Sequence, residues 1–211
     1  MKKTIISIDG PAASGKGKIA KYISKKWKFK HLDSGIIYRR LAFIVLKEKV
    51  NYKSEYQLKK LISKDRSITF RKSKVLRTEE ISRIASEIAV YGFIRNYINK
   101  IQRNFVNSNL KNKCFVIDGR DIGSVVFKNA DLKLYIEVTE ENRAKRRYKQ
   151  LIDGGEKSIY PQILKDIKLR DKKDKLRKNS PLLKPNGAFV INNNDNFKIT
   201  INQLDILIGN L

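Results

Sequence analysis

The sequence predicts an α/β fold in which helices flank a parallel sheet. Short apolar runs alternate with stretches whose apolar residues recur at helical spacing, a pattern typical of strands joined by right-handed helical crossovers. The first apolar run, Ile5–Ile8, leads into a glycine-containing turn and a lysine where a helix begins. With 211 residues, the chain can form one α/β core with an insertion, or two small domains.

The turn after the first strand has the pattern G-x-x-x-x-G-K. Its glycines allow several backbone N–H groups to point inward, and the following helix N-terminus adds positive potential. We therefore expect a phosphate loop for ATP, with Lys16 reaching the β- and γ-phosphates. Gly17 stands where the usual motif has a serine or threonine for magnesium. The predicted ATP-binding residues here are Gly10, Pro11, Ala12, Ala13, Ser14, Gly15, Lys16, Gly17 and Lys18.

A simple turn between a strand and a helix would be the alternative interpretation of this loop. The context favours the phosphate loop, because an apolar run precedes it and an amphipathic helix pattern follows. That pattern comprises Ile19, Ala20, Ile23 and Trp27. A short second strand is then expected at Phe29–Leu32, ended by Asp33, and an apolar helix from Ile36 to about Leu46.

The next part of the chain, from about 51 to 77, is polar, lysine-rich and poorly periodic. It is neither glycine- nor proline-rich, so we interpret it as a small insertion, with a short helix at Gln57–Ile62 and a short strand at Ser67–Phe70. Thr78 followed by two glutamates predicts a capped helix start. Gly92 is expected to break or kink that helix, after which a second apolar face runs from Ile94 to Phe105.

Three further strands and three further helices are expected in the second half. The strands are Cys114–Ile117, Leu132–Val138 and Ala188–Ile191, and the helices begin at Thr139, Pro161 and Phe197. Gly154 and Gly155 interrupt the first of these helices. Since ligands bind off the carboxyl ends of parallel strands, one sheet edge should gather the phosphate loop, Asp33 and Ser34, the segment 118–121 and the start of the 139 helix.

The amino-acid composition narrows the classes of partner and reaction that this chain could have. Lysine and arginine number 47 against 21 acidic residues, a formal charge of +26, which favours anionic partners. A solvated lysine-rich surface accounts for this charge as well as a nucleic-acid footprint does, because the lysines are spread over the whole length. A single histidine argues against a histidine metal site or a catalytic triad. Phosphoryl transfer instead needs two substrates held in line and cations on the shared charge.

One cysteine excludes an internal disulfide. The N-terminus shows no signal-peptide pattern, and no apolar stretch approaches the roughly 20 residues that span a bilayer. We therefore expect a soluble cytoplasmic protein, a monomer, with small-molecule substrates and no obligate nucleic-acid or membrane partner.

Six strings, in this order, resemble the bacterial cytidylate kinases: IDGPAASGKGK, HLDSGIIYR, RTEEISRIAS, IDGRDIGSVVF, ENRAKRRYKQL and RDKKDKLR. They cover nearly the whole chain. The resemblance implies a P-loop NTPase fold with a five-stranded parallel sheet, a CMP-binding insertion and a small arginine-rich lid. It also implies transfer of phosphate from ATP to CMP or dCMP with Mg²⁺. It divides the chain into a core (1–33, 93–140 and 180–211), a CMP-binding region (34–92) and a lid with a basic helix (141–179).

The resemblance also implies roles for individual residues. Asp118 would contact Mg²⁺ through water, and Arg146 and Arg147, with Arg143, would form the start of the lid over ATP. The implied catalytic residues are Lys16, Arg120, Arg147 and Arg177. The implied substrate-binding residues are Ser34, Tyr38, Arg39, Ser86, Arg95, Arg120, Asp121, Arg170 and Asp174. Asp121 is the natural acceptor for the cytosine N4 amino group, and arginine suits a terminal phosphate.

Alternatives remain at several positions. Asp118 could balance Arg120, Arg146 and Arg147 could form a solvated face, and Ser86 could be a small core residue. Two departures from the family also stand out: Lys18 replaces the usual threonine, and the stretch 52–77 is short. The rival functions are a small P-loop kinase for UMP or a metabolite, and a basic RNA-binding protein on a nucleotide fold. The sequence lacks an aromatic-rich RNA-reading motif.

Overall fold

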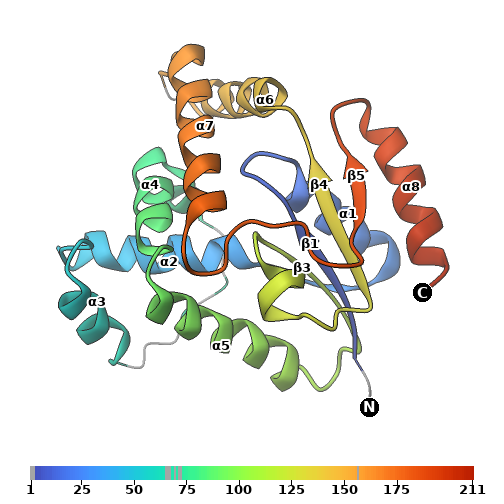
Figure 1. Cartoon of the computed structure of the whole chain (residues 1–211), viewed down its shortest axis with the longest axis horizontal. Coiled ribbons are helices and arrows are strands. Elements are labelled where there is room, and N and C mark those ends of the chain that lie inside the picture. The colour runs from blue at the N-terminus through green and yellow to red at the C-terminus, as the bar shows by residue number, and fades with distance from the viewer. Residues whose placement is uncertain (1–2, 65–67, 69, 71–72, 156) are drawn as a thin grey trace. The chain divides into compact units, whose positions relative to one another are not determined.

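The computed structural model describes residues 3–64, 68, 70, 73–155 and 157–211. The chain forms two compact units (Figure 1): a core unit, Met1–His31 with Asn112–Leu211, and a helical unit, Leu32–Lys111. The division into core, CMP-binding region and lid that the resemblance implies is a functional one, and it stays a prediction.

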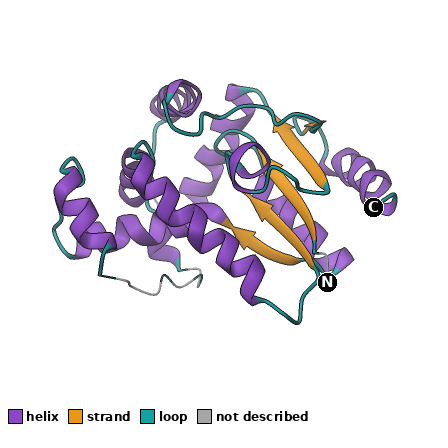
Figure 2. Cartoon of the chain, turned by 60° about the horizontal axis from the view of Figure 1, so that its bottom comes forward, coloured by secondary structure: helices purple, strands orange, loops and turns teal. Residues whose placement is uncertain are grey.

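The core unit is built on the sheet drawn in Figure 2. Its strand order is β2-β3-β1-β4-β5. The central strand β1 pairs in parallel with β3 and β4, and β4 pairs in parallel with β5. Ile6 of β1 lies opposite Val116 of β3 on one side and Leu132 of β4 on the other, so these three residues form one row across the sheet. The predicted five-stranded parallel sheet is confirmed. The strands are β1 Thr4–Asp9, β2 Lys30–Asp33, β3 Cys114–Asp118, β4 Leu132–Glu137 and β5 Phe189–Asn192.

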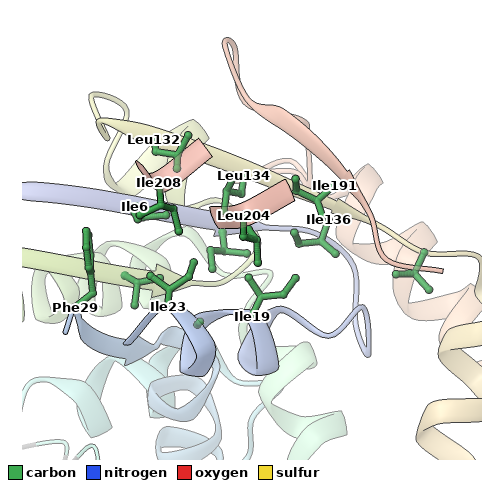
Figure 3. Close-up of a cluster of buried hydrophobic side chains, with 14 residues drawn as sticks. Ile6, Ile19, Ile23, Phe29, Leu132, Leu134, Ile136, Ile191, Leu204 and Ile208 are labelled. Carbon is green, nitrogen blue, oxygen red and sulfur yellow. The ribbon is translucent and has the colours of Figure 1, made fainter. Parts of the chain in front are cut away.

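A buried apolar cluster joins this sheet to α1 (Lys16–Trp27) and α8 (Phe197–Gly209), as Figure 3 shows. The side chains of α1 and α8 in this cluster follow the helical spacing that the sequence displays. Each fully buried aliphatic side chain contributes on the order of 1.5–3 kcal/mol relative to exposure. The most completely buried members are Ile6, Ile8, Ile19, Ala20, Ile23, Val116, Leu134, Ile136 and Leu204.

Two further helices of the core unit, α6 (Glu140–Asp153) and α7 (Tyr160–Leu176), pack on each other through a small apolar cluster of their own. The Thr139 side chain accepts a hydrogen bond from the backbone N–H of Asn142 and so caps α6, as its position predicts. The glycines at 154 and 155 follow the end of α6. Between β3 and β4 lies a single π-helical turn, η2 (Ile122–Val126), which the sequence pattern does not predict.

The helical unit contains α2 (Ser34–Lys47), α3 (Glu55–Ile62), the 3₁₀ turn η1 (Lys74–Arg77), α4 (Glu79–Ile88) and α5 (Gly92–Ser108). Thr78 caps α4 by accepting a hydrogen bond from Ile81 N–H. Gly92 breaks the helical pattern as expected, since α4 ends at Ile88 and α5 begins at Gly92. The predicted strand at Ser67–Phe70 includes residues outside the described part of the chain. Among the described residues, no helix is long and apolar enough to cross a membrane.

Candidate active site

The loop between β1 and α1 has the backbone that a phosphate loop requires. Gly10 and Gly15 have φ of +148° and +91°, a region that favours glycine. A Cβ at Gly10 would lie 2.6 Å from the carbonyl oxygen of Ile136, and one at Gly15 would lie 2.5 Å from Nδ2 of Asn193. Both glycines are therefore required by backbone conformation and by close neighbours.

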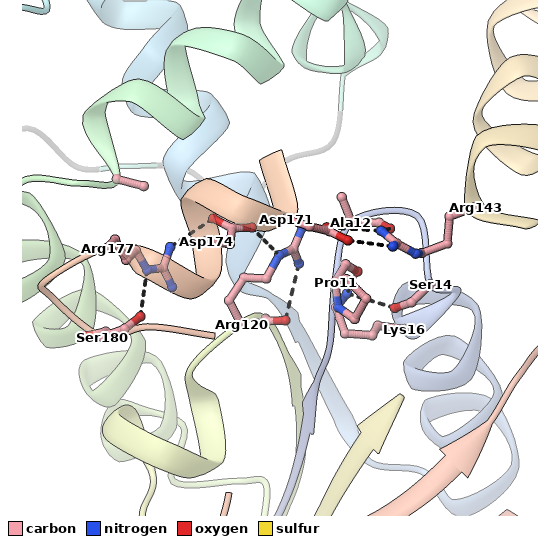
Figure 4. Close-up of polar contacts among 12 residues, drawn as sticks. Pro11, Ala12, Ser14, Lys16, Arg120, Arg143, Asp171, Asp174, Arg177 and Ser180 are labelled. Atoms are coloured by element: carbon pink, nitrogen blue, oxygen red, sulfur yellow. Dashed lines mark hydrogen bonds and ion pairs between the residues drawn. The ribbon is translucent and has the colours of Figure 1, made fainter. Parts of the chain in front are cut away.

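Lys16 begins α1 and folds back over the loop (Figure 4). Its Nζ donates hydrogen bonds to the carbonyl oxygen of Pro11 at 2.6 Å and to Oγ of Ser14 at 3.1 Å. Burial lowers the pKa of Lys16 well below its usual value, and the charge of Arg120 lowers it further, although Asp118 raises it. A buried ammonium group beside another cation gains stability from a nearby anion. The electrostatics around Lys16 therefore favour a phosphate ligand.

The Lys18 side chain lies against α8. Its Nζ lies 3.8 Å from the ring centroid of Phe197, the first residue of α8, in a cation–π contact. The side chain is exposed. The charge that replaces the family's usual threonine hydroxyl is thus held against an aromatic ring at the start of α8.

Asp118, at the end of β3, pairs with His31 of β2. Its Oδ1 lies 2.6 Å from Nε2 of this histidine. A Cβ at Gly17 would lie 3.9 Å from Oδ2 of Asp118. The carboxylate therefore lies beside the position where the usual motif has its magnesium-binding hydroxyl.

This arrangement fits a magnesium ion that comes with its nucleotide. Mg²⁺ keeps several waters and binds through one or two carboxylates together with substrate phosphates. Asp118 supplies one such carboxylate next to the phosphate loop. Among the described residues, no cluster of three histidine, cysteine or acidic side chains could hold a metal ion by itself.

Asp174 on α7 gathers two of the predicted arginines (Figure 4). Its Oδ2 accepts from Nε of Arg120 and its Oδ1 from Nη1 of Arg177, both at 3.2 Å. Nε of Arg177 also donates to the carbonyl oxygen of Ser180 at 2.6 Å. Burial raises the pKa of Asp174, but the charges of Arg120, Arg170 and Arg177 outweigh burial and lower it. The structure thus brings together four residues that the sequence predicts for the site.

Arg143, by contrast, is part of a closed buried pair. Its guanidinium makes two parallel hydrogen bonds to Asp171, at 3.0 and 2.5 Å, and donates to the carbonyl oxygens of Val138 at 3.0 Å and Ala12 at 3.3 Å. Both side chains are almost fully buried. Arg143 therefore ties α6 and α7 to the phosphate loop.

A cavity of about 370 Å³ lies at the end of β4; among its lining residues are Pro11, Tyr135, Glu137, Arg143 and Lys175.

Asn193, which follows β5, is a site residue that the sequence analysis missed. Its Nδ2 donates to the carbonyl oxygen of Ser14 at 2.8 Å, and its Oδ1 accepts from the hydroxyl of Thr200 at 3.0 Å. Its own carbonyl oxygen accepts from Nη2 of Arg146 at 2.6 Å. Burial lowers the pKa of Arg146. One buried residue therefore connects the phosphate loop and α8 through its side-chain amide, and α6 through its backbone carbonyl. The only hint in the sequence is the run of three asparagines after an apolar strand.

In the helical unit, the predicted substrate residues lie on three helices. Ser34 is buried at the start of α2, and Nη2 of Arg39 lies 3.3 Å from Oδ2 of Asp33. Arg95 of α5 is buried, with its guanidinium 5.7 Å from the ring centroid of Tyr38 and a hydrogen bond to a backbone carbonyl. Ser86 of α4 is partly exposed, which does not match a small core serine.

The sheet topology, the phosphate loop with its buried lysine, and the arginines gathered on Asp174 define the class of P-loop kinases. The family model for cytidylate kinase matches residues 6–204. Two relatives from Rickettsia felis and Rickettsia africae, each named cytidylate kinase, are 40% and 42% identical to this chain. These matches cover 90% and 88% of this chain and 84% and 82% of the relatives. The chain belongs to the cytidylate kinase family, and the resemblance stated from the sequence is confirmed.

Solved structures show the same fold at low identity. A Thermus thermophilus protein, TT1252, is 16% identical with a TM-score of 0.52, and the match covers 100% of this chain and 99% of that chain. A protein from Eubacterium ventriosum is 13% identical with a TM-score of 0.50, covering 97% and 98%. At this identity the likeness concerns the fold alone.

Proposed function

We propose that this protein transfers the γ-phosphoryl group of ATP to CMP, and to dCMP, giving ADP and CDP or dCDP. Membership of the family supports this activity, and the observation that carries it is the buried Lys16 beside Asp118 and the arginine cluster on Asp174. Phosphoryl transfer requires little covalent chemistry from a protein, so positioned cations are its main contribution. The site consists of groups of that kind.

On the donor side, Lys16 would exchange its bonds to Pro11 and Ser14 for the β- and γ-phosphate oxygens. The backbone N–H groups of residues 12–17 would hold the remaining phosphate oxygens, and Arg146 and Arg147 on α6, within the lid segment 141–179, would neutralise phosphate charge. Mg²⁺, bound to ATP and reached from Asp118 through water, would neutralise the charge that develops between the phosphates.

On the acceptor side, the core unit contributes Arg120, Asp121, Arg170, Asp174 and Arg177. We propose that Arg120 binds the CMP phosphate, that Asp121 accepts from the cytosine N4 amino group, and that Arg177 stabilises the transferring phosphoryl group. Arg170 and Asp174 would contact the sugar. The helical unit contributes Ser34, Tyr38, Arg39, Ser86 and Arg95 within the proposed CMP-binding region, 34–92.

Three finer points belong to the same proposal. The enzyme acts as a monomer, works in the cytoplasm, and needs neither nucleic acid nor a membrane. Size-exclusion chromatography with light scattering checks the first point, and a mass near twice 24.5 kDa would contradict it.

The experiment is ADP formation from ATP over a panel of CMP, dCMP, UMP, AMP and GMP, with Mg²⁺ present and absent. We expect turnover with CMP and dCMP that depends on Mg²⁺, and at least a tenfold lower kcat/KM with UMP, since uracil lacks the N4 donor that Asp121 would read. Preferential use of UMP or of a purine nucleotide would contradict the proposed acceptor. RNA binding at physiological salt without CMP-dependent ADP formation would contradict the proposal as a whole.

A further inference from the structure

Asp9, the last residue of β1, holds a distant segment of the core unit through two backbone amides. Its side chain is fully buried, and each oxygen accepts one bond: Ile122 N–H donates to Oδ1 and Gly123 N–H donates to Oδ2, both at 2.7 Å. These partners lie 113 and 114 residues further along the chain. The carboxylate therefore fixes the backbone directly after Arg120 and Asp121.

The backbone on the other side of these two residues is also held by β1. Gly119 N–H donates to the carbonyl oxygen of Ile8 at 2.9 Å, which continues the ladder between β1 and β3. Arg120 and Asp121 thus lie on a two-residue segment that consecutive residues of β1, Ile8 and Asp9, hold at both ends.

Packing at Gly123 leaves no room for this segment to shift toward β1. A Cβ there would lie 2.6 Å from Oγ of Ser7, 3.1 Å from Cγ of Pro185 and 3.2 Å from Oδ2 of Asp9. The π-helical turn η2 begins at Ile122, within the same contact. Such turns are rare and occur frequently at functional sites.

Keeping a charged carboxylate in this buried position has an energetic cost. Burial raises the pKa of Asp9 to about 7, even though the two amide hydrogen bonds lower it. An asparagine would fit the same space but could accept only one amide, and its own N–H would face the other. Two converging N–H groups require two acceptor oxygens, which only a carboxylate of this size provides.

We propose that Asp9 is a positioning residue of the acceptor site: through the amides of Ile122 and Gly123 it sets the backbone from which Arg120 and Asp121 reach the acceptor nucleotide. The inference rests on the proposed function. It predicts a selective defect, because misplacing two acceptor-reading side chains lowers turnover of CMP while the phosphate loop can still bind ATP.

The test compares Asp9→Asn with the matched control Ser7→Ala. Ser7 lies on the same strand, is fully buried and also faces Gly123, but its hydroxyl has no hydrogen-bond partner among the described residues. For Asp9→Asn we expect kcat/KM for CMP to fall roughly 10- to 100-fold, a size typical of a small misplacement at a catalytic centre. The preference for CMP over UMP should fall as well, with the Kd for ATP changed less than about threefold. Ser7→Ala should match the wild type.

A folded Asp9→Asn protein with unchanged kcat/KM for CMP, or one that loses ATP affinity and CMP turnover equally, would overturn the proposal. Amide hydrogen exchange provides a readout that is independent of activity. Exchange at Ile122 and Gly123 should accelerate at least about tenfold in Asp9→Asn, with β4 amides unchanged; unchanged exchange would also overturn it.

The two proposals can fail separately. If the wild type forms no ADP with CMP, the proposed function fails, while exchange at Ile122 and Gly123 still tests the role of Asp9. If Asp9→Asn does not fold, Gly123→Ala replaces it, because the added methyl group displaces the turn from Ser7 and Asp9 while the Asp9 side chain itself is retained. The same selective loss of CMP turnover is then expected, and its absence overturns the inference.

Discussion

Two buried aspartates, Asp171 and Asp174, lie one turn apart on α7 and hold arginines in opposite ways. Both oxygens of Asp171 accept hydrogen bonds from Arg143, and Arg143 also donates to the backbone carbonyls of Val138 and Ala12. Asp174 is shared by Arg120 and Arg177, and the Arg120 side chain remains 22% exposed. The first pair is closed and structural. The second is a shared carboxylate: Arg120, its more exposed arginine, can exchange partners with an anion, whereas the Arg177 side chain is only 5% exposed.

This difference in pairing gives the arginines on Asp171 and Asp174 different roles. A buried bidentate pair gains little from a new ligand and loses much when one partner is removed. A carboxylate beside three arginines leaves an excess of positive charge, which is what a phosphate group needs. We therefore assign Arg143 to the scaffold and keep Arg120 and Arg177 in the proposed reaction.

The largest effect should come from opening the closed pair. Asp171→Asn leaves the buried Arg143 without its counter-charge, which costs about 3–5 kcal/mol of unfolding free energy in comparable pairs. Urea unfolding followed by circular dichroism measures this loss. A loss below about 1 kcal/mol would mean that the two aspartates do not differ as described.

Asp174→Asn should do the reverse, with a smaller change in stability and a larger change in function. We expect kcat/KM for CMP to fall on the order of 10²-fold, because Arg120 and Arg177 lose the group that orients them. Steady-state kinetics with varied CMP measures the loss. Asp171→Asn, assayed where it remains folded, is the matched control, and equal kinetic losses in the two variants would contradict the comparison.

The pH dependence of stability separates Asp174 from Asp9. Because the pKa of folded Asp174 is lowered, its stabilising contribution is present above its unfolded value of about 3.8 and is lost as pH falls through the lower folded pKa. Because the pKa of folded Asp9 is raised to about 7, its contribution is fully present below pH 3.8 and is lost as pH rises through 7.

Urea unfolding from pH 3 to 8 measures both effects as differences from the wild type. Asp174→Asn should remove only the dependence near and below pH 3.8, and Asp9→Asn only the decline between about pH 4 and 7. Identical pH profiles for the two variants would contradict this assignment.

The smallest effect is expected at Lys18. Its ammonium group lies against Phe197 on the surface, so Lys18→Thr should change the KM for ATP by only a few fold, leaving kcat for CMP nearly unchanged. ATP titration at saturating CMP measures this change, and Lys21→Thr, an exposed lysine on the same helix, is the control. Identical kinetics for Lys18→Thr and the wild type would show that the position is neutral.

Local patterns predicted the elements of this fold well. The phosphate loop, the cap at Thr78 and the break at Gly92 depend on residues within one or two turns of each other, so their spacing in the sequence is sufficient. The long-range partners could not be predicted in this way. Asp9 bonds amides 113 and 114 residues away, and Asn193 bonds Ser14 across 179 residues. These contacts exist only once the sheet has brought its strand ends together.

The same difference between local patterns and long-range contacts explains which roles of the candidate residues could be predicted. Lys16 could be predicted from the local G-x-x-x-x-G-K pattern, and the role of Asp118 was implied by the family resemblance. The scaffold role of Arg143 could not be predicted, since its burial depends on how α6 packs against α7. His31 as the partner of Asp118 also required the order of strands in the sheet, in which β2 adjoins β3.

CMP-dependent ADP formation by Lys16→Ala, compared with the wild type with Mg²⁺-ATP, tests whether the buried lysine drives phosphoryl transfer. We expect a variant that unfolds at nearly the same urea concentration and turns over at least on the order of 10²-fold more slowly, because the charge on the transferring phosphates is no longer neutralised. Turnover equal to that of the wild type by a folded Lys16→Ala protein would contradict this role of the lysine.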